Sequence, residues 1–513
     1  MQSISRLAAA LAVVAAVPAT QAAPLITDFD PADFDANVIV VNTSGASAQR
    51  SAINQFSKLV CDGGVFREYR DDNGTTVGGS WRSYFCQFAA TWPNGDPNPL
   101  AGQKVLFNTR TKGGSVWGVI PVQENYSVEM MNILSPTCSL VGSRYHCTWD
   151  NSNRTPTAAA NGECDFAVIE GGVSGRPVAN GQSTICVRPD LGASDEEPSF
   201  FTDENLPALF AEQPDESKLV KASLFGVQFA PEVTLPVYRV LQEAQGILNP
   251  GDPDDYDNPN TAPSLTKEQL SAIFSGEITN WNQIATPVGT PWPDFNQGSL
   301  GLCRRTNGSG TQAGATRYLF SRPGKCGGTV FMVTDNTAAD GSANGTCDDA
   351  ANGQLCYVEN SGSDDVNTCL DRMNGVGAPI NTFFAGIDPT LKMGAIGFNA
   401  IEKPSVPGVS QWRFVKVDGV APTTENGVTG EWDWAYENSM QAPATPVPAR
   451  APATATVTAA MLAQLGDPAV VDLLGTPGNW ALRDNGFTPS TVAPLVGFGS
   501  RLGNSCNEVI IVP

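Results

Sequence analysis

The chain has 513 residues, with 52 acidic and 30 basic side chains and a formal net charge of -22. This length indicates more than one folding unit. The negative charge argues against binding nucleic acid or an anionic membrane surface through bulk electrostatics, so an anionic ligand must be recognised by a local group of donors. The sequence has neither an H-E-x-x-H nor a Walker A motif, and we expect no metal or other cofactor.

The first 23 residues are typical of a secretory signal peptide. "MQSISRLAAALAVVAAVPATQAAP" has one arginine, an apolar run, and small residues around Ala22 and Ala23. The run is too short for a membrane span, and no later stretch reaches the roughly 18 uncharged apolar residues that a spanning helix needs. We therefore expect an exported chain, periplasmic or secreted, with no membrane insertion. A buried N-terminal helix is the alternative.

Twelve cysteines follow this segment. Because extracytoplasmic compartments are oxidising and the number is even, we expect disulfide bonds. Metal ligation is the alternative, but the sequence has no C-x-x-C pair and a single histidine, His146. Sequence neighbours such as Cys138 and Cys147 are candidate partners, and the remaining connectivity stays open.

Along the chain, apolar strands alternate with helices. Val38–Val41 is an apolar, β-branched run, and a small-residue loop separates it from a helical pattern with Ile53, Phe56 and Val60 on one face. The same strand–loop–helix order recurs in "LGLCRRTNGSGTQAGATRYLF". In "QKVLFNTRTKGGSVWGVIPV" we expect a strand, a polar turn at Thr109–Ser115 and a second apolar run. "CDFAVIEGGVSG" predicts a short strand that ends at Glu170. We further expect an amphipathic helix in "SLTKEQLSAIFSGEITNWNQI" and a buried strand in "KMGAIGFNAIE".

This alternation predicts an α/β fold with largely parallel sheets. In open sheets of this kind, ligands bind at the carboxyl ends of the strands, where loops lead into helix N-termini. A Pro/Ala-rich connector, "QAPATPVPARAPATATV", lies near the C-terminal end. Loop-rich insertions are expected at Asp62–Pro99, Asn125–Glu163, Pro250–Pro263 and Gly324–Glu359.

One loop has the character of an anion site. Arg305–Thr311, "RTNGSGT", precedes a helix that is expected to start near Gln312. Unpaired backbone N–H groups and the helix dipole favour negative charge at such a start. The glycines allow close backbone approach, the hydroxyls of Ser309 and Thr311 add donors, and Arg305 can make a two-pronged contact with an oxyanion. A plain helix cap is the alternative.

Three segments in this part of the chain resemble, in order, the periplasmic phosphate-binding components of ABC transporters. "LTKEQLSAIFSGEITNWNQI" is similar to that family's L-T-x-x-x-L-x-x-I-F-x-G-x-I-x-x-W segment, "RTNGSGT" to its R-x-D-G-S-G-T anion loop, and "GAIGF" to its G-A-I-G-Y strand. The resemblance covers about Phe225 to Glu402 well and the first half of the chain loosely. It implies the type 2 substrate-binding-protein fold: two α/β lobes with a hinge and an anion held in the cleft between them.

The resemblance also implies anion loops in the first half. "TSGASAQ" is similar to the family's first loop and places Ser47 and the N–H of Ala48 at the ligand. "RTKGG" resembles a divergent form of the second loop, G-S-S-G-G, and places Thr111 there, with Ser115 as a rival. "DFAVIE" is similar to the third, D-F-G-A-S-D, and puts Glu170 at its last aspartate. A surface turn is the alternative for each loop. The expected ligand set is Ser47, Ala48, Thr111, Glu170, Arg305, Asn307, Ser309, Gly310 and Thr311.

Two of these residues depart from the family. A carboxylate beside a bound oxyanion is repelled unless a proton lies between them, and phosphate at neutral pH carries such a proton whereas sulfate does not. We therefore expect Glu170 to favour phosphate or arsenate over sulfate, although it is one methylene longer than the family's Asp. Asn307 replaces an Asp that partners the loop arginine in the family, so Arg305 would be held by a neutral contact.

The expected organisation is a signal peptide at 1–23, a first lobe of 24–228 plus 400–513, and a second lobe of 229–399 with the anion loop. Strands near Gly226–Pro236 and Gly394–Ala400 would join the lobes. The expected function is non-catalytic capture of inorganic phosphate, or a similar tetrahedral oxyanion, by a monomer outside the cytoplasm. The resemblance implies an ABC permease as partner, and the large insertions leave a stand-alone phosphate scavenger open.

Two other functions stay open. A secreted phosphatase-like enzyme could use the same pocket, but it would need a nucleophile or a metal. The only histidine, His146, lies beside a candidate disulfide, and the acidic loop Gly251–Asn260 lacks the spacing of a calcium site. An extracellular interaction protein with a vestigial pocket is the third candidate.

Overall fold

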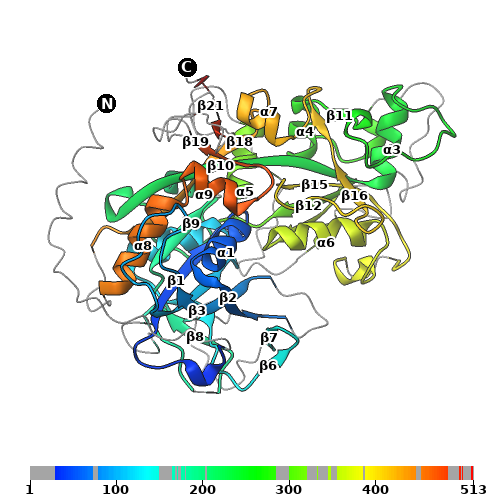
Figure 1. Ribbon diagram of the computed structural model, residues 1–513. Coiled ribbons are helices and arrows are strands. Elements are labelled where there is room, and N and C mark those ends of the chain that lie inside the picture. The colour runs from blue at the N-terminus through cyan, green and yellow to red at the C-terminus, as the bar shows by residue number, and fades with distance from the viewer. Residues whose placement is uncertain are drawn as a thin grey trace.

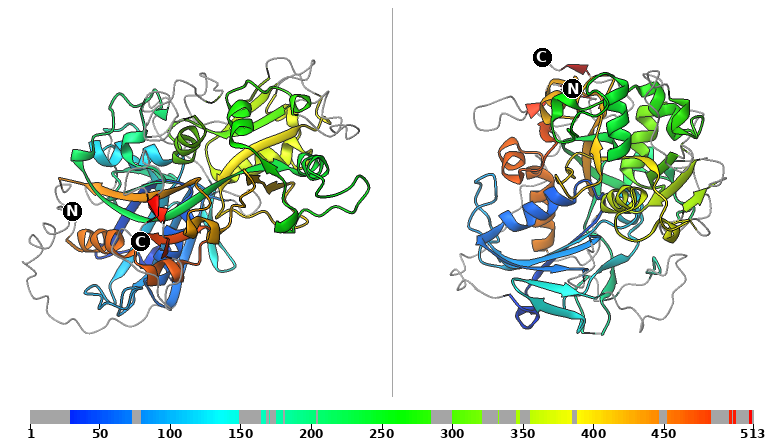
Figure 2. Two further views of the ribbon diagram at one scale, coloured as in Figure 1. Left: turned by 90° about the horizontal axis from the view of Figure 1, so that it is seen from above. Right: turned by 90° about the vertical axis from the view of Figure 1, so that its right-hand side faces the viewer.

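The computed structural model describes most of the chain after residue 28, and the expected signal peptide lies outside the described residues. Seen from above in Figure 2, two halves rich in strands and helices lie side by side. The described residues are 29–72, 79–148, 164–167, 170, 175–179, 181–202, 205–284, 300–320, 332, 345–347, 355–384, 388–445, 452–482, 496–497, 499–500 and 510–511.

One mixed sheet runs through both halves. Its main path of strands, from the second half to the outer edge of the first, is β13 (Gly345–Cys347), β14 (Cys356–Asn360), β12 (Leu300–Arg305), β15 (Gly394–Ala400), β10 (Leu219–Thr234), β18 (Ala435–Pro443), β9 (Leu191–Ser194), β1 (Ile39–Gly45), β4 (Lys104–Arg110), β3 (Trp81–Phe88), β2 (Cys61–Arg70), β7 (Arg144–Cys147) and β6 (Cys138–Val141). β16 (Trp412–Phe414), β19 (Asn479–Leu482) and β20 (Val496–Gly497) branch from this path.

Three short two-stranded sheets complete the described strands. They pair β11 (Ser264–Leu265) with β17 (Lys416–Val417), β5 (Val128–Met131) with β8 (Thr184–Val187), and β21 (Gly499–Ser500) with β22 (Ile510–Ile511).

The long strand β10 belongs to both halves (Figure 1). Its first part pairs with β18 and β19, and its last part pairs with β15 and β16. The division into lobes stays a prediction, but β16 and β17 bear on its second boundary. They follow the expected boundary at 399/400, and they pair with the end of β10 and with β11, on the side of the second half.

In the first half, helices bury apolar faces against the β1–β4 region. α1 (Arg50–Leu59) forms because Ala52, Ile53 and Phe56 recur at helical spacing, and all three are buried in the core. α8 (Pro452–Gln464) and α9 (Pro468–Leu474) contribute to the same core. The other side carries the 3-10 helix η3 (Ser115–Gly118) and α2 (Ile120–Glu124), with a separate apolar cluster.

No single helix in the described part of the chain is long and apolar enough to cross a membrane. The pair α8 and α9, bent by 92° at their junction, passes the same test of length and composition together. In this structure α8 packs on the sheet: Val457 and Met461 are buried, and the Thr454 hydroxyl donates to Val40 O over 3.2 Å.

In the second half, helices cover both faces of the sheet. α3 (Leu235–Ala244), α4 (Lys267–Phe274) and α5 (Gly310–Phe320) share one apolar core with β12 and β15, and α6 (Ser363–Met373) packs on the opposite face. A disulfide between Cys303 and Cys369 joins β12 to α6. The remaining described helices are α7 (Thr424–Thr429) and the short 3-10 helices Pro31–Asp33, Pro198–Phe200, Glu216–Lys218, Pro259–Thr261, Trp281–Gln283 and Ile380–Thr382.

The expected α/β class is confirmed, and so is the expectation of disulfides. The other described disulfides link Cys61 with Cys86, Cys138 with Cys147, and Cys164 with Cys186.

The sequence predicted largely parallel sheets, and this prediction was wrong for the main sheet. Parallel pairs join β1 to β4 and β9, β12 to β14 and β15, β2 to β7, and β19 to β20. By contrast, β10 and β18 pair antiparallel with each other, and so do the strands of the β2–β3–β4 meander. The expectation failed because strands from the C-terminal segment and from the hairpins add to the two parallel centres.

Candidate anion-binding site

The predicted anion loop lies where strand ends from the two halves meet. In the second half, β12 ends at Arg305 and β14 at Asn360, and they lead toward the N-termini of α5 and α6. In the first half, β1 pairs in parallel with β4 and β9, so the loops after these strands leave from one edge. The N–H of Val116 donates to Gly308 O over 2.9 Å and joins the two groups of loops.

Arg305 is the cation at the centre of this junction, and its side chain is fully buried. Its Nε donates to Asn360 O over 3.2 Å, and its Nη2 donates to Ser361 O over 2.8 Å. Its Nη1 lies 3.3 Å from Ser363 Oγ and 3.4 Å from Thr311 Oγ1. Burial lowers the pKa of Arg305 to about 10, so the guanidinium remains charged at neutral pH. The structure therefore holds a fixed positive charge between two helix N-termini.

The rest of the loop folds as a helix start. Ser309 is buried, and its Oγ accepts from Gln312 N–H over 3.3 Å. Gly308 has a φ of +85°, which favours glycine. Asn307 does not partner Arg305: its Oδ1 accepts from Nη2 of Arg304 over 3.0 Å. The neutral contact expected for Arg305 is therefore supplied by the backbone carbonyls and by the hydroxyl of Ser363.

A carboxylate that the sequence analysis missed lies against this loop. Asp195 directly follows β9 and is buried; its Oδ2 accepts from the Thr311 hydroxyl over 3.3 Å. Gly310 leaves the space it needs, since a Cβ there would lie 2.8 Å from Cβ of Asp195. The signal was present, because "DLGASD" (Asp190–Asp195) matches the D-F-G-A-S-D pattern more closely than "DFAVIE" does.

Asp195 combines deep burial with a carboxylate oxygen that the described residues leave unsatisfied. Burial raises the pKa of Asp195 to about 6, against the opposing effects of Arg305 and of the hydroxyls of Ser115 and Thr311. Its Oδ1 is buried and has no hydrogen-bond partner among the described residues. A buried polar atom without a partner costs free energy, which a bound donor would recover.

Ser115, the rival of Thr111, is the hydroxyl nearer to this carboxylate. Ser115 Oγ accepts from the N–H of Asp195 over 3.2 Å, and a Cβ on Gly310 would lie 2.4 Å from it. Thr111 is also buried, but its N–H and hydroxyl lie against the carbonyl of Ser80, over 2.8 and 3.4 Å. The expected second apolar run after this turn forms η3 and α2, which brings Ser115 to the junction.

Glu170 lies in a different part of the first half. It pairs with Cys186 on β8: the Glu170 N–H donates to Cys186 O over 2.7 Å, and the Cys186 N–H donates to Glu170 Oε2 over 2.8 Å. The strand expected to end at Glu170 begins instead with a turn, since residues 164–167 form no strand. β9 is one of the two strands beside β1, so Asp195, which follows it, lies against the anion loop, whereas Glu170 does not.

Ser47 and Ala48, at the end of β1 and before α1, reach the second half. Ser47 Oγ lies 3.2 Å from Ser363 Oγ, which in turn contacts Arg305. Ala48 is fully buried and packs into the core of the second half. Of the nine expected ligand residues, the structure gathers seven around Arg305 or on its loop: Ser47, Ala48, Arg305, Asn307, Ser309, Gly310 and Thr311.

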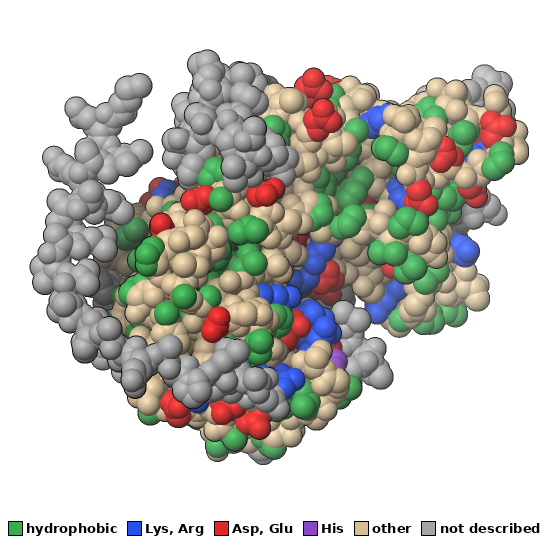
Figure 3. Space-filling view, in the orientation of Figure 1, with side chains coloured by type: hydrophobic (Ala, Val, Ile, Leu, Met, Phe, Trp, Pro, Cys, Tyr) green, Lys and Arg blue, Asp and Glu red, His purple; other side chains and the backbone are tan. Residues whose placement is uncertain are grey.

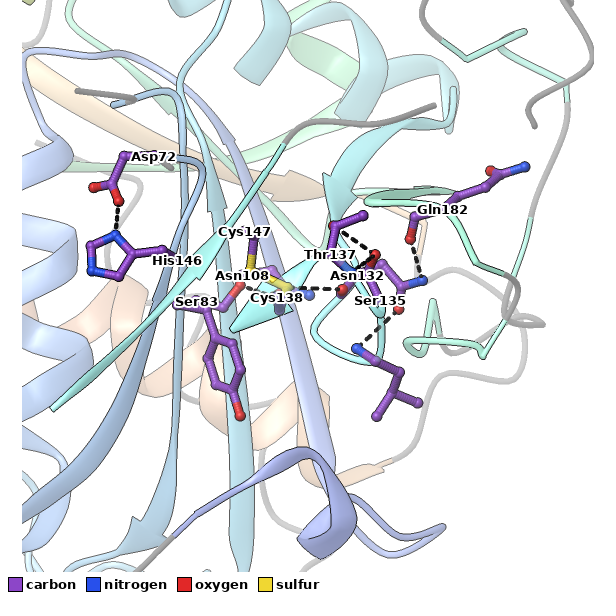
Figure 4. The surroundings of a disulfide bond; sticks show 12 residues. Asp72, Ser83, Asn108, Asn132, Ser135, Thr137, Cys138, His146, Cys147 and Gln182 are labelled. Atoms are coloured by element: carbon purple, nitrogen blue, oxygen red, sulfur yellow. Dashed lines mark hydrogen bonds and ion pairs between the residues drawn. A yellow bond between two sulfur atoms is a disulfide. The ribbon is translucent and has the colours of Figure 1, made fainter. Parts of the chain in front are cut away.

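The single histidine is placed away from this junction. His146 lies on β7, in the hairpin closed by the disulfide between Cys138 and Cys147, and its Nδ1 contacts Asp72 Oδ1 (Figure 4). This hairpin forms the outer edge of the sheet path, whereas β9 and β1 lie at its centre. The described residues contain no group of three or more His, Cys, Asp or Glu side chains that could hold a metal ion.

Residues 247–382, which include the anion loop, match the family model of a PBP superfamily domain. A comparison with curated proteins finds no match.

Among solved structures, the chain is similar to a putative phosphate ABC transporter substrate-binding protein with bound phosphate from Clostridium perfringens, at 11% identity and a TM-score of 0.38, covering 85% of this chain and 98% of the other. It is also similar to the ancestral soluble variant of the Human Phosphate Binding Protein, at 13% identity and a TM-score of 0.35, covering 85% and 90%. An ABC-type phosphate transport receptor from Vibrio cholerae matches at 14% identity and a TM-score of 0.28, covering 56% and 79%.

The family match and the observed topology agree on the fold. The matched segment contains β12, the anion loop, α5, β14 and α6, which are the elements that surround Arg305. Residues 247–382 are therefore similar to a PBP superfamily domain, and they lie within a chain of α/β fold.

Proposed function

We propose that the protein captures inorganic phosphate, or a similar tetrahedral oxyanion, at the junction around Arg305, without catalysis. The observation that carries this proposal is that Arg305 and Asp195, a buried cation and a buried carboxylate from opposite halves, lie close enough for each to shift the pKa of the other. A buried cation held by backbone carbonyls offers its charge to an anion, and the helix N-termini add N–H donors and a favourable dipole.

We assign to Asp195 the selective role that the sequence had given to Glu170. A monoprotonated phosphate can donate its proton to the free Oδ1 of Asp195 while its other oxygens accept from Arg305 and the loop N–H groups. Sulfate has no such proton, so its charge is repelled by the same carboxylate. The pKa of about 6 keeps Asp195 mostly ionised at neutral pH in the free protein, as an acceptor must be.

Because both halves contribute residues to the junction, the anion can be captured when the two halves close around it. Asp195, Ser115 and Ser47 come from the first half, and Arg305, Ser309 and Thr311 from the second, so a ligand between them is enclosed when the halves approach. The PBP superfamily match supports a binding protein rather than an enzyme. We further propose that the protein acts outside the cytoplasm, with an ABC permease as its partner, because the disulfides are typical of oxidising compartments.

Calorimetric titration of the purified chain tests this function. We expect saturable binding of phosphate and arsenate with a stoichiometry of about one, and no heat with sulfate at the same concentration. The same preparation should release no nitrophenol from nitrophenyl phosphate, with or without added divalent metals. Absence of binding for all three anions would contradict the proposal, and metal-dependent release of nitrophenol would favour the phosphatase.

A further inference from the structure

A second group of cations lines a pocket of about 330 Å³ beside the Arg305 junction. The pocket lies between α1, the β2–β3 hairpin, the residues that follow β15, and the end of α9. In Figure 3, Lys and Arg side chains gather in the hollow between the two halves of the molecule. The charged residues that line the pocket are Arg50, Lys58, Arg70, Arg82, Lys403 and Glu402.

Carboxylates beside the pocket contact some of these cations, and Glu68 pairs with Arg70 over 2.7 Å. Asp364 is shared by two of them, since Arg50 Nη2 lies 2.5 Å and Lys403 Nζ 3.3 Å from its carboxylate oxygens. Burial lowers the pKa of Lys58; Glu68 opposes this shift, and repulsion from Arg70 and Arg82 adds to it. Burial likewise lowers the pKa of Arg82, with added repulsion from Arg70 and Arg50. Like charges held close in a half-buried space favour an anion between them.

Glu402 gives an independent indication that a ligand belongs here. The residue is 6% exposed, and both carboxylate oxygens are buried without a hydrogen-bond partner among the described residues. Burial raises its pKa to about 7, against the opposing effects of Lys403 and Arg50. Near neutral pH Glu402 can therefore carry a proton and donate it to an oxygen of an anionic ligand. Without a ligand, this group is left with unsatisfied polar atoms.

We propose that this pocket, whose lining does not include Arg305 or Asp195, binds a small anion with two or more negatively charged groups. Its volume is at the lower end of the range of small-molecule sites, about 300–1,000 Å³, and its cations come from three directions: α1, the β2–β3 hairpin and the segment after β15. A ligand with several charged groups can reach these cations at once, whereas a single charge cannot. Phosphoryl and carboxylate groups share the required chemistry.

The test uses the full chain with the Arg305 junction disabled by Arg305→Gln, so that its outcome does not depend on the proposed phosphate capture. Pyrophosphate and citrate are titrated separately as phosphoryl and carboxylate probes. We expect at least one of them to bind, and we expect Lys58→Gln, added to Arg305→Gln, to weaken it about tenfold or more, the usual cost of a lost charged hydrogen bond. Lys392→Gln, which removes an exposed lysine outside the pocket, should leave the affinity unchanged.

Two outcomes would overturn the proposal. One is that neither probe binds to the Arg305→Gln protein while its thermal unfolding remains cooperative. The other is that Lys58→Gln and Lys392→Gln weaken binding equally, which would indicate unspecific attraction. Lys58 is only half-buried, so this variant should fold, and Arg82→Gln provides a second test of the same pocket.

Discussion

The two halves of the molecule contribute to the Arg305 junction in different ways. The second half supplies one contiguous loop, in which strand β12, the glycines, the hydroxyls and the start of α5 follow one another within about a dozen residues. The first half supplies single residues from three separate strand ends: Ser47 after β1, Ser115 after β4 and Asp195 after β9. A buried charge and its donors can be predicted from the sequence when one loop carries them all. Residues that come together only through strand pairing cannot be predicted in this way.

The halves also differ in charge. The second half places its buried arginine against carbonyl oxygens and hydroxyls, and the first half places a buried carboxylate opposite it. Neither group forms a direct ion pair with the other in the described contacts, although each shifts the pKa of the other. The junction therefore keeps one donor and one acceptor available for a ligand that has both.

The largest effect should come from the cation of the second half. Arg305→Gln should weaken phosphate binding by at least about 30-fold, since removing one partner of a buried charged contact costs about 2 kcal/mol or more. Arg413→Gln is the matched control, because Arg413 is a buried arginine of the same half that pairs with Asp257 over 2.6 Å. Calorimetry on both variants checks this. Equal losses would show that the effect is a general one on folding.

Asp195, the buried carboxylate of the first half, should affect how the unfolding free energy depends on pH even without a ligand. Because its folded pKa of about 6 lies above the usual value of 3.8, Asp195 favours the folded state below pH 4, and this contribution is lost as the pH rises through 6. Between pH 4 and 7, Asp195→Asn should therefore gain up to about 3 kcal/mol in unfolding free energy relative to wild type. Urea unfolding at several pH values measures this, with the exposed Asp62→Asn as control. A constant difference across this range would contradict the assigned burial.

The close approach of the halves depends on Gly310. Gly310→Ala places a methyl group against Ser115 Oγ and Asp195 Cβ, so one half must shift. We expect a loss of about 1–3 kcal/mol in phosphate binding, in the range of overpacking in a buried site. The same titration checks it, and an unchanged affinity would show that the halves do not meet at this glycine when phosphate is bound.

A smaller effect distinguishes the two hydroxyl candidates of the first half. Ser115→Ala should weaken phosphate binding by about 1 kcal/mol, the usual value of one hydrogen bond, because Ser115 holds Asp195 in place. Thr111→Ala should leave binding unchanged, since Thr111 faces Ser80. The reverse order in calorimetry would restore the assignment expected from "RTKGG".

Much of the fold could be predicted from local sequence. The β-branched run before α1 and the apolar spacing of Ile53 and Phe56 gave β1 and α1 in order. The antiparallel strands β18 and β19 could not be predicted in this way. They pair with β10 across more than 200 residues of chain, and no local pattern encodes that return.

The site shows the same limit. "RTNGSGT" was sufficient to propose Arg305, Ser309, Gly310 and Thr311 as ligand residues, because they follow one another in a single loop. Asp195 was missed although "DLGASD" is present, because two similar strings compete and only the pairing of β9 with β1 decides between them. Asn307 was placed on the right loop but given the wrong partner, since two arginines are adjacent and the strand directs their side chains to opposite faces.

The central claim, that Asp195 opposite Arg305 selects phosphate, is tested most directly by the ratio of phosphate to sulfate affinity in Asp195→Asn and Glu170→Gln. At pH 7 to 8 we predict that Asp195→Asn lowers this ratio about tenfold or more, because the amide no longer repels sulfate and can donate a hydrogen bond to it. Glu170→Gln should leave the ratio at the wild-type value. An unchanged ratio in Asp195→Asn, or a lowered ratio in Glu170→Gln, would contradict the account.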